Sequence, residues 1–345
     1  MTESDTSTAV HYQALTGNGF VAGIDLGGTK ILVAIVGPDG SILTRAKKKS
    51  GRGSGDAGVV IDRIADCVRE ATKAAEITLG QIKAIGIGAP GPIVLETGVV
   101  SVAVNLGWHD VPLKAELERR LDVPVAVDND VRVAVLAEYL AGAGRGSRNM
   151  IGIWPGTGIG GGVVLNGEIF VGSTNSAGEV GHMTIKAGGA LCACGGKGHL
   201  ESLASRTAIV RDITERVQAG EKSALTSIVG PDVSLATSGD LAAALNQGDK
   251  LVIRVLDRAA KYLSIGIASL ANLLNPEVVV LGGGLVQALG DPFVRLIAQK
   301  VEGRPMLAAT KPLKIVQSVL GDDAGIIGSA IVARRLANRL EVTSV

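Results

Sequence analysis

Residues 23–43 read GIDLGGTKILVAIVGPDGSIL, and residues 152–170 read GIWPGTGIGGGVVLNGEIF. Each stretch is an apolar run, a glycine-rich turn, a second apolar run, a tight turn and a third apolar run, which predicts three short strands. In the second stretch the tight turn is Asn166–Gly167, a strong signal for a β-hairpin. A repeated unit of this size predicts two similar domains.

The segments around the two copies alternate between helix and strand patterns. Apolar residues recur at helical spacing in residues 59–71, 131–141, 251–274 and 325–340. Short apolar runs predict strands at residues 83–88, 124–127 and 278–281. This alternation indicates an α/β protein.

We expect three regions along the chain. Residues 1–20 are polar and are expected to form a disordered tail. A smaller α/β domain is expected to combine residues 21–135 with residues 330–345. Residues 136–329 are expected to form a larger α/β domain that carries a metal-binding loop.

The composition argues against nucleic-acid and membrane partners. The 345 residues include 34 basic and 33 acidic ones, well mixed along the chain, and only 2% are aromatic. A nucleic-acid-binding protein would show a basic stripe and stacking platforms. No apolar run reaches the ~18 residues of a membrane span, and the N-terminus lacks the order of a signal peptide.

The cysteine content indicates a reducing compartment. Three cysteines are too few for a secreted disulfide framework, and Cys192 and Cys194 are too close in sequence to bridge without strain. We therefore expect a cytoplasmic protein. Cys67 lies on the apolar face of the helix expected at residues 59–71, so it is interpreted as a packing residue.

The first glycine turn has the residue types of a phosphate site. Its glycines allow backbone N–H groups to face an anion, and a hydroxyl adds a further donor. A carboxylate at the end of the preceding strand can hold a hydrated Mg²⁺ that bridges phosphates. The candidate residues are Asp25, Gly27, Gly28, Thr29 and Lys30.

The second copy provides a similar turn at Gly156, Thr157 and Gly158. Two such turns facing each other across a cleft could clamp one polyphosphate. Neither turn matches the Walker or the Rossmann pattern. Gly282, Gly283 and Gly284, after a strand, could let an adenine or ribose lie against the backbone, but for this motif taken alone tight strand–helix packing is the preferred interpretation.

The sequence VDND at residues 127–130 lies between an expected strand and an expected helix. Phosphoryl transfer needs a group that orients or deprotonates the attacking hydroxyl. Asp130 is the candidate base, and Asn129 can hold a neighbouring hydroxyl. The cap of the following helix is expected at Asp128 or Asn129, and for Asp128 an ordinary helix cap is the preferred interpretation.

His182, Cys192, Cys194 and His199 have the residue types of a tetrahedral zinc site. Four protein ligands leave no open position, so the metal is expected to be structural. Glu179 and Glu201 lie close to the two histidines in sequence. Fixing this glycine-rich loop would fix both carboxylates, which suits the binding of sugar hydroxyls.

Through these motifs and others, the chain resembles the ROK family of sugar kinases and repressors, and within it the glucokinases. The resemblance covers about residues 21 to 335 and rests on DLGGTK, GIGAPGPI, NLGW, VDND, GTGIGGG, EVGH, CACGGKGHLE, NPEVVVLGGGL and GDDAGIIGSA.

The resemblance implies an actin-like, ribonuclease-H-type fold of two duplicated domains, with ATP and a hexose in the cleft between them. It makes Asp130 the general base and places Gly283 and Gly284 in the adenosine region. It also implies a homodimer or homotetramer. The implied sugar-binding residues are Asn105, Asn129, Asp130, Glu179, His182 and Glu201.

One position departs from the family pattern CxCGxxGC, because His199 stands where the last cysteine is usual. Histidine is a good zinc ligand, so a Cys₂His₂ site is expected. The ATP-dependent reaction expected first is phosphorylation of glucose. Kinases of N-acetylglucosamine, N-acetylmannosamine, fructose and allose share these motifs and stay open as alternatives.

Other classes of protein are less compatible with the sequence. Repressors of the family carry a DNA-binding segment before the first motif, and about twenty residues precede it here. A sugar sensor without activity would be expected to lack Asp130 or a glycine turn. A hydrolytic actin-like ATPase would not need EVGH or the metal loop.

Overall fold

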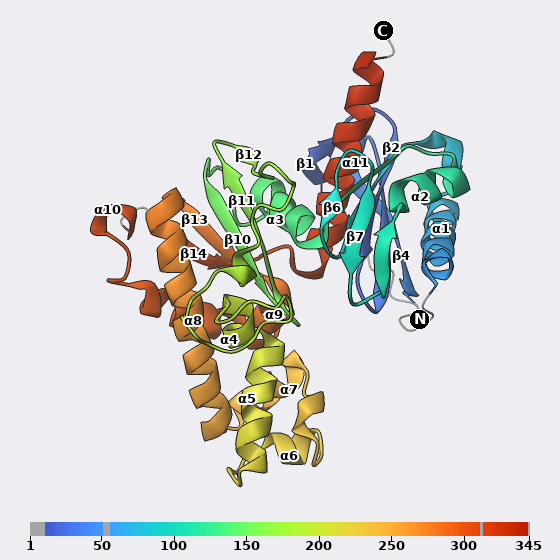
Figure 1. The fold of residues 1–345 in the computed structure, drawn as a ribbon. Coiled ribbons are helices and arrows are strands. Elements are labelled where there is room, and N and C mark those ends of the chain that lie inside the picture. The colour runs from blue at the N-terminus through green and yellow to red at the C-terminus, as the bar shows by residue number, and fades with distance from the viewer. Residues whose placement is uncertain (1–10, 51–55, 311–312, 344–345) are drawn as a thin grey trace, which may run out of the picture. The chain divides into compact units, whose positions relative to one another are not determined.

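The computed structural model describes residues 11–50, 56–310 and 313–343, which form two compact units (Figure 1). The first unit combines the chain up to Ala141 with Gly172–Ser176 and with the chain from Asp322 onward. The second unit holds Gly142–Val171 and Ala177–Gly321. Compared with the expected boundaries, residues 136–141, 172–176 and 322–329 belong to the first unit instead of the second.

The first unit is built on a six-stranded sheet of order β1-β4-β3-β2-β5-β9. Strands β2, β3 and β4 are antiparallel neighbours, whereas β5 is parallel to β2 and β9 is parallel to β5. The strands are β1 His11–Thr16, β2 Phe20–Leu26, β3 Lys30–Val36, β4 Asp39–Lys49, β5 Ile82–Ala89 and β9 Val125–Asn129. A second sheet consists of β6 Ile93–Val94, β7 Val99–Ala103 and β8 Trp108–Val111.

The second unit repeats this plan in a five-stranded sheet of order β12-β11-β10-β13-β14. Strands β10, β11 and β12 are antiparallel neighbours, and β13 and β14 continue the sheet in parallel. The strands are β10 Met150–Pro155, β11 Ile159–Leu165, β12 Glu168–Ile169, β13 Val278–Leu281 and β14 Lys314–Gln317. The order and directions equal those of β4-β3-β2-β5-β9, so the predicted duplication and α/β fold class are confirmed.

Helices cover both faces of the first sheet. Helix α1 (Ala57–Ala74) packs against β3 and β4, and α11 (Ala324–Thr343) packs against β2 and β5. A Cβ on Gly23 would lie 2.2 Å from the carbonyl oxygen of Ile326, so α11 lies directly on the strand backbone. The unit also contains α2 Leu113–Leu121 and α3 Asp130–Ala141.

In the second unit the long α8 (Lys250–Leu274) packs against α9 (Gly283–Val301) and closes a large apolar core. The remaining helices are α4 Leu200–Ala204, α5 Arg206–Gln218, α6 Leu225–Ile228, α7 Ser238–Asn246 and α10 Leu307–Thr310. Among the described residues of either unit, no helix combines the length and the apolar character that crossing a bilayer would need.

The expected disordered tail is wrong for part of its length. Residues 1–10 lie outside the described residues, but His11–Thr16 form β1, which pairs with β4. Leu15 is fully buried, and the buried guanidinium of Arg334 donates to its carbonyl oxygen at 3.0 Å. Backbone pairing and this bond order a segment whose side chains are mostly polar.

Candidate functional site

The first glycine turn, Gly27–Lys30, joins β2 to β3. Its carbonyl oxygens accept hydrogen bonds from Ser50 and from the amide of Gly27. The amide of Gly27 donates to Lys30 O at 2.9 Å. The buried Ser50 donates from Oγ to Gly28 O at 2.9 Å and from its amide to Thr29 O at 3.0 Å. Ser50 thus holds two carbonyls of the turn, and the Gly27 amide is paired within the turn itself.

Asp25 lies near the end of β2, beside Gly325 in the first turn of α11, and the pKa of its carboxyl is raised. Burial raises the pKa of its carboxyl from 3.8 to about 6; Lys30 lowers that pKa and Asp322 raises it. Lys30 Nζ lies 3.4 Å from Asp322 Oδ2. A buried carboxylate with a second acid nearby is stabilised by a cation, so these residues fit the expected Mg²⁺.

Asn105 lies in the exposed turn between β7 and β8 and reaches the first glycine turn. A Cβ on Gly28 would lie 3.2 Å from Asn105 Cβ. The structure therefore brings Asn105 next to Gly28, and any larger residue at position 28 would press on it.

Asn129 lies where β9 ends, and it caps α3. Its Oδ1 accepts from the amides of Val131 at 3.1 Å and Arg132 at 3.0 Å, and its Nδ2 donates to Gly91 O at 3.2 Å. Asp130 is the first residue of α3, and its Oδ1 accepts from the amide of Val131 at 2.8 Å. The predicted base and its neighbour thus belong to one rigid strand-to-helix junction.

Of the two residues expected near the helix cap, Asn129 is the one that caps α3, and the interpretation of Asp128 as an ordinary cap was wrong. Its carboxylate forms an ion pair with Arg132, whose side chain is 5% exposed, and it also accepts from the amide of Asn129 at 2.6 Å. A guanidinium this deeply buried needs a counter-ion. The cap is Asn129, and Asp128 neutralises Arg132.

The second glycine turn, Gly156–Gly158, joins β10 to β11 and is bound by the start of α5. The amide of Gly156 donates to Gly158 O at 2.8 Å, and the amide of Arg206 donates to Gly156 O at 2.9 Å. Arg206 Nη2 donates to Thr157 Oγ1 at 2.8 Å, and Thr207 Oγ1 donates to Thr157 O at 2.7 Å. These contacts give the turn a fixed conformation.

Some of the glycines after β13 fit tight strand–helix packing, and one fits the alternative of a backbone open to an adenine or ribose. A Cβ on Gly282 would lie 2.5 Å from the Trp154 ring, and one on Gly283 would lie 2.8 Å from Pro155 O. Gly283 also has φ +80°, which favours glycine. These two positions reflect tight packing. A Cβ on Gly284 would meet no atom within 4 Å, so this backbone is open to a ligand.

The predicted metal residues come together in the second unit. One ligand atom from each of His182, Cys192, Cys194 and His199 lies within 4.8 Å of the others. Cys194 Sγ is 3.3 Å from His199 Nδ1, and Cys192 Sγ is 3.8 Å from His182 Nδ1. Tetrahedral Zn²⁺ bound to sulfur and nitrogen would place these atoms about 3.6 Å apart. The donor set therefore fits zinc in both chemistry and spacing.

Glu201 makes contacts that sequence reasoning did not foresee. Its Oε2 accepts from the amide of Ile159 at 2.8 Å, directly after the second glycine turn, and its Oε1 accepts from Cys192 Sγ at 3.6 Å. Glu179, in contrast, is exposed just before a short helical turn, Val180–His182. The two carboxylates expected to act alike have different surroundings.

Several supporting residues were also missed. Ser50, Arg206 and Thr207 hold the two glycine turns, and Ser329, fully buried in α11, donates to Ile24 O at 2.7 Å. Ser50, Arg206 and Thr207 lie outside the quoted motifs and carry no sequence signal of this kind, whereas Ser329 lies within GDDAGIIGSA but its bond to Ile24 does not follow from that pattern.

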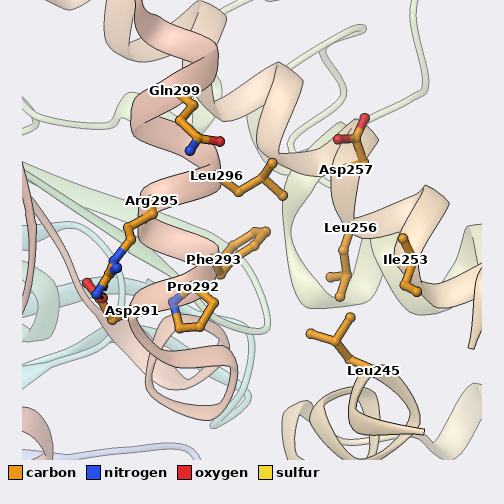
Figure 2. A pocket seen from close by; sticks show the side chains of 10 residues that line it. All are labelled: Leu245, Ile253, Leu256, Asp257, Asp291, Pro292, Phe293, Arg295, Leu296 and Gln299. Atoms are coloured by element: carbon orange, nitrogen blue, oxygen red, sulfur yellow. Dashed lines mark hydrogen bonds and ion pairs between the residues drawn. The ribbon is translucent and has the colours of Figure 1, made fainter. Parts of the chain in front are cut away.

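A cavity of about 620 Å³ lies elsewhere in the second unit, between α8 and α9 (Figure 2). Its walls are mostly apolar and include Ile253, Leu256, Phe293 and Leu296, with Asp257 and Arg295 at the rim. Its lining contains none of the residues predicted from sequence, so the candidate site does not coincide with this cavity.

Five strands of the first sheet and the five strands of the second share one order and one set of directions, each with a glycine turn between paired antiparallel strands. This duplicated arrangement is that of the actin-like class of folds. Residues 21–336 match the ROK family, and the chain belongs to that family.

Its relatives include both enzymes and regulators. The chain is 39% identical over 320 residues to a glucokinase from Halalkalibacterium halodurans, with 92% of this chain and 96% of the relative covered. It is 31% identical over 312 residues to a xylose repressor from Caldicellulosiruptor bescii, with 90% of this chain and 77% of the relative covered.

Solved structures of the family superpose on it. A ROK family glucokinase from Streptomyces griseus in complex with glucose and AMPPNP has a TM-score of 0.77 and 32% identity, with 92% of this chain and 100% of that chain covered. The predicted family and its actin-like kinase fold are therefore confirmed.

Proposed function

We propose that this protein is a glucokinase, which transfers the γ-phosphate of ATP to glucose and releases glucose 6-phosphate and ADP. The observation that carries the proposal is the 39% identity to a glucokinase over nearly the whole of both chains. A structural relative that binds glucose and AMPPNP supports both substrates.

The proposed roles follow from the surroundings of each residue. Asp130 accepts the proton of the attacking hydroxyl, and catalysis otherwise depends on positioning and charge neutralisation. Asp25 would hold Mg²⁺, which would offset the negative charge of the phosphates. The glycine turns bind phosphate through their amides and Lys30, and Gly284 offers open backbone to the nucleoside. The proposed sugar-binding residues are Asn105, Asn129, Glu179, His182 and Glu201.

A structural Zn²⁺ is part of the proposal. Its ligands would be Cys192, Cys194, His199 and His182, the last of which also belongs to the proposed sugar site. The ion would supply no chemistry to the reaction, because four protein donors fill its coordination sphere. It would hold residues 182–199 in one conformation.

A coupled assay of ADP release tests the proposal. Purified protein receives Mg–ATP with no sugar, or with glucose, N-acetylglucosamine, N-acetylmannosamine, fructose or allose. We expect turnover that depends on sugar and is highest with glucose. The Asp130→Asn variant, purified in parallel, controls for contaminating kinases.

Each alternative predicts a different result. Higher turnover with another hexose would replace glucose as the substrate. ADP release that does not depend on sugar would indicate an ATPase. Sugar binding without ADP release would indicate a sensor like the regulatory relatives.

The proposal also covers the oligomeric state, the cellular location and the roles of the two units. The protein is proposed to be a homodimer or homotetramer, which sedimentation velocity would test. It is proposed to act in the cytoplasm, where ATP and sugar are supplied, and cell fractionation would test this. The two units are proposed to act as the two domains of the kinase.

A further inference from the structure

One carboxylate in the second unit contacts two elements that bind different substrates in the proposed function. Glu201 Oε2 accepts from the amide of Ile159 at 2.8 Å, and this amide follows the second glycine turn directly. Glu201 Oε1 accepts from Cys192 Sγ at 3.6 Å, within the metal loop, residues 182–199. Glu201 is therefore a direct link between the phosphate turn and the metal loop.

The Glu201 carboxylate packs closely against Gly158 of the second glycine turn. A Cβ on Gly158 would lie 2.3 Å from Glu201 Oε2 and 3.1 Å from its carboxyl carbon. Gly158 does not have a positive φ, so its backbone does not by itself demand glycine. The side chain that occupies the space of a Cβ at position 158 is that of Glu201.

The position of Glu201 also depends on the metal loop through the backbone, because Glu201 follows His199 by two residues at the start of α4. Its Oε2 holds the amide of Ile159, and in the proposed function its carboxylate also accepts from a sugar hydroxyl. One side chain would thus touch the hexose and hold the phosphate turn.

We propose that Glu201 is a positioning residue that couples the second glycine turn to the metal loop, so that hexose affinity and nucleotide affinity each depend on both elements. The proposal rests on the proposed function for the identity of the two substrates. It gives Glu201 a role that Glu179, which is exposed and has no such contact with the turn, does not share.

The first test is a double-mutant cycle on glucose affinity, measured by calorimetry without nucleotide. Gly158→Ala should displace the Glu201 carboxylate and weaken glucose binding roughly tenfold or more, the loss expected for a charged hydrogen bond. In a Glu201→Ala background the same change should alter glucose affinity by less than about twofold, because residues that act through one contact are not additive.

Gly80→Ala is the control, at an exposed glycine outside the proposed site. A Cβ there would meet no atom within 4 Å, and its φ is not positive. Glucose affinity should therefore stay within about twofold of wild type. Wild-type affinity in Gly158→Ala, or an equal loss from Gly158→Ala in both backgrounds, would overturn the proposal. Zinc content and thermal unfolding confirm that each variant is folded.

The second test uses Mg–ADP binding without sugar, so it does not depend on the identity of the hexose. Glu201→Ala should weaken Mg–ADP binding several-fold, and Glu201→Gln should restore much of it, because an amide oxygen can still accept from Ile159. Glu179→Ala should leave Mg–ADP affinity unchanged. Equal nucleotide affinities in Glu201→Ala and wild type would overturn the coupling. Failure of the wild type to bind any hexose would refute only the proposed function.

Discussion

Asp128 and Arg132 form an ion pair across the junction where β9 ends and α3 begins. The guanidinium also donates to Asn175 O at 2.7 Å, and the carboxylate also accepts from the amide of Asn129. The pair therefore fixes the backbone on both sides of Asp130. A fixed backbone also fixes the position of the Asp130 carboxylate. This favours its proposed role as base, because proton transfer requires a fixed distance to the hydroxyl.

Asp130→Asn should lower turnover with glucose by ~10²–10⁴-fold, the usual contribution of a general base. Glucose affinity should change little, because an amide oxygen can still accept from a hydroxyl and from the amide of Val131. Steady-state kinetics and calorimetry measure the two quantities separately. A variant that kept more than about a tenth of wild-type turnover would remove Asp130 from the role of base.

Asp128→Asn should destabilise the fold strongly, because it leaves the buried Arg132 without its counter-ion. Removing one partner of a buried pair costs about 3–5 kcal/mol. Urea denaturation measures the free energy of unfolding. Asp66→Asn is the control: it breaks the exposed pair of Asp66 with Arg69 and should cost less than about 1 kcal/mol. Similar losses in both variants would contradict the role given to the Asp128–Arg132 pair.

The raised pKa of Asp25 predicts a specific dependence of stability on pH. The native carboxyl keeps its proton up to pH about 6, whereas its ordinary pKa is 3.8. Between these values the folded state binds more protons than the unfolded chain, so this group makes stability fall as pH rises from about 4 to about 6. The fall is up to about 3 kcal/mol and levels off above pH 6.

Asp25→Asn should remove that part of the fall and raise stability at pH 7, as measured by urea denaturation across pH 4 to 8. In the wild type, Mg–ADP affinity should rise with pH through about 6, because Mg²⁺ competes with the proton for the carboxylate. The variant should show weak Mg–ADP binding without this rise. A pH-independent affinity in the wild type would separate Asp25 from the cation site.

The fold could be predicted from sequence where local pattern and tertiary position agree. The helix expected at residues 251–274 is α8, Lys250–Leu274, because its apolar stripe faces a core and Asn275, at φ +46°, ends it. The two-residue turn Asn166–Gly167 joins β11 to β12 as expected. Strand β1 was missed, because its order depends on pairing with β4 and on Arg334, more than 300 residues away.

The sequence allowed the residues of the candidate site to be named, but it did not allow the contacts between them to be predicted. The four metal residues were found because their chemistry is distinctive and three of them lie within eight residues. The contact of Glu201 with Ile159 joins residues 42 apart in sequence and involves a backbone amide, which has no sequence signature. Sequence proximity to His199 suggested that Glu201 served the sugar alone.

The contact of Glu201 with Ile159 links the metal residues to the second glycine turn. Wild-type protein should contain about one zinc per chain, because four donors of suitable spacing fill one tetrahedral site. His199→Cys should keep the metal, since thiolate and imidazole both suit Zn²⁺, and it restores the usual pattern of the family. His199→Ala should lose most of it, because a ligand atom 3.3 Å from Cys194 Sγ is removed.

Elemental analysis of the three proteins gives the metal content, and separate titrations with glucose and with Mg–ADP give the consequences. From sequence distance alone, loss of metal would weaken sugar binding and spare the nucleotide. Because Glu201 lies two residues from His199 and holds the amide of Ile159, we expect His199→Ala to weaken both ligands. Full metal content in His199→Ala would remove His199 from the ligand set. A metal-free variant with wild-type affinity for both ligands would show that residues 182–199 keep their conformation without zinc.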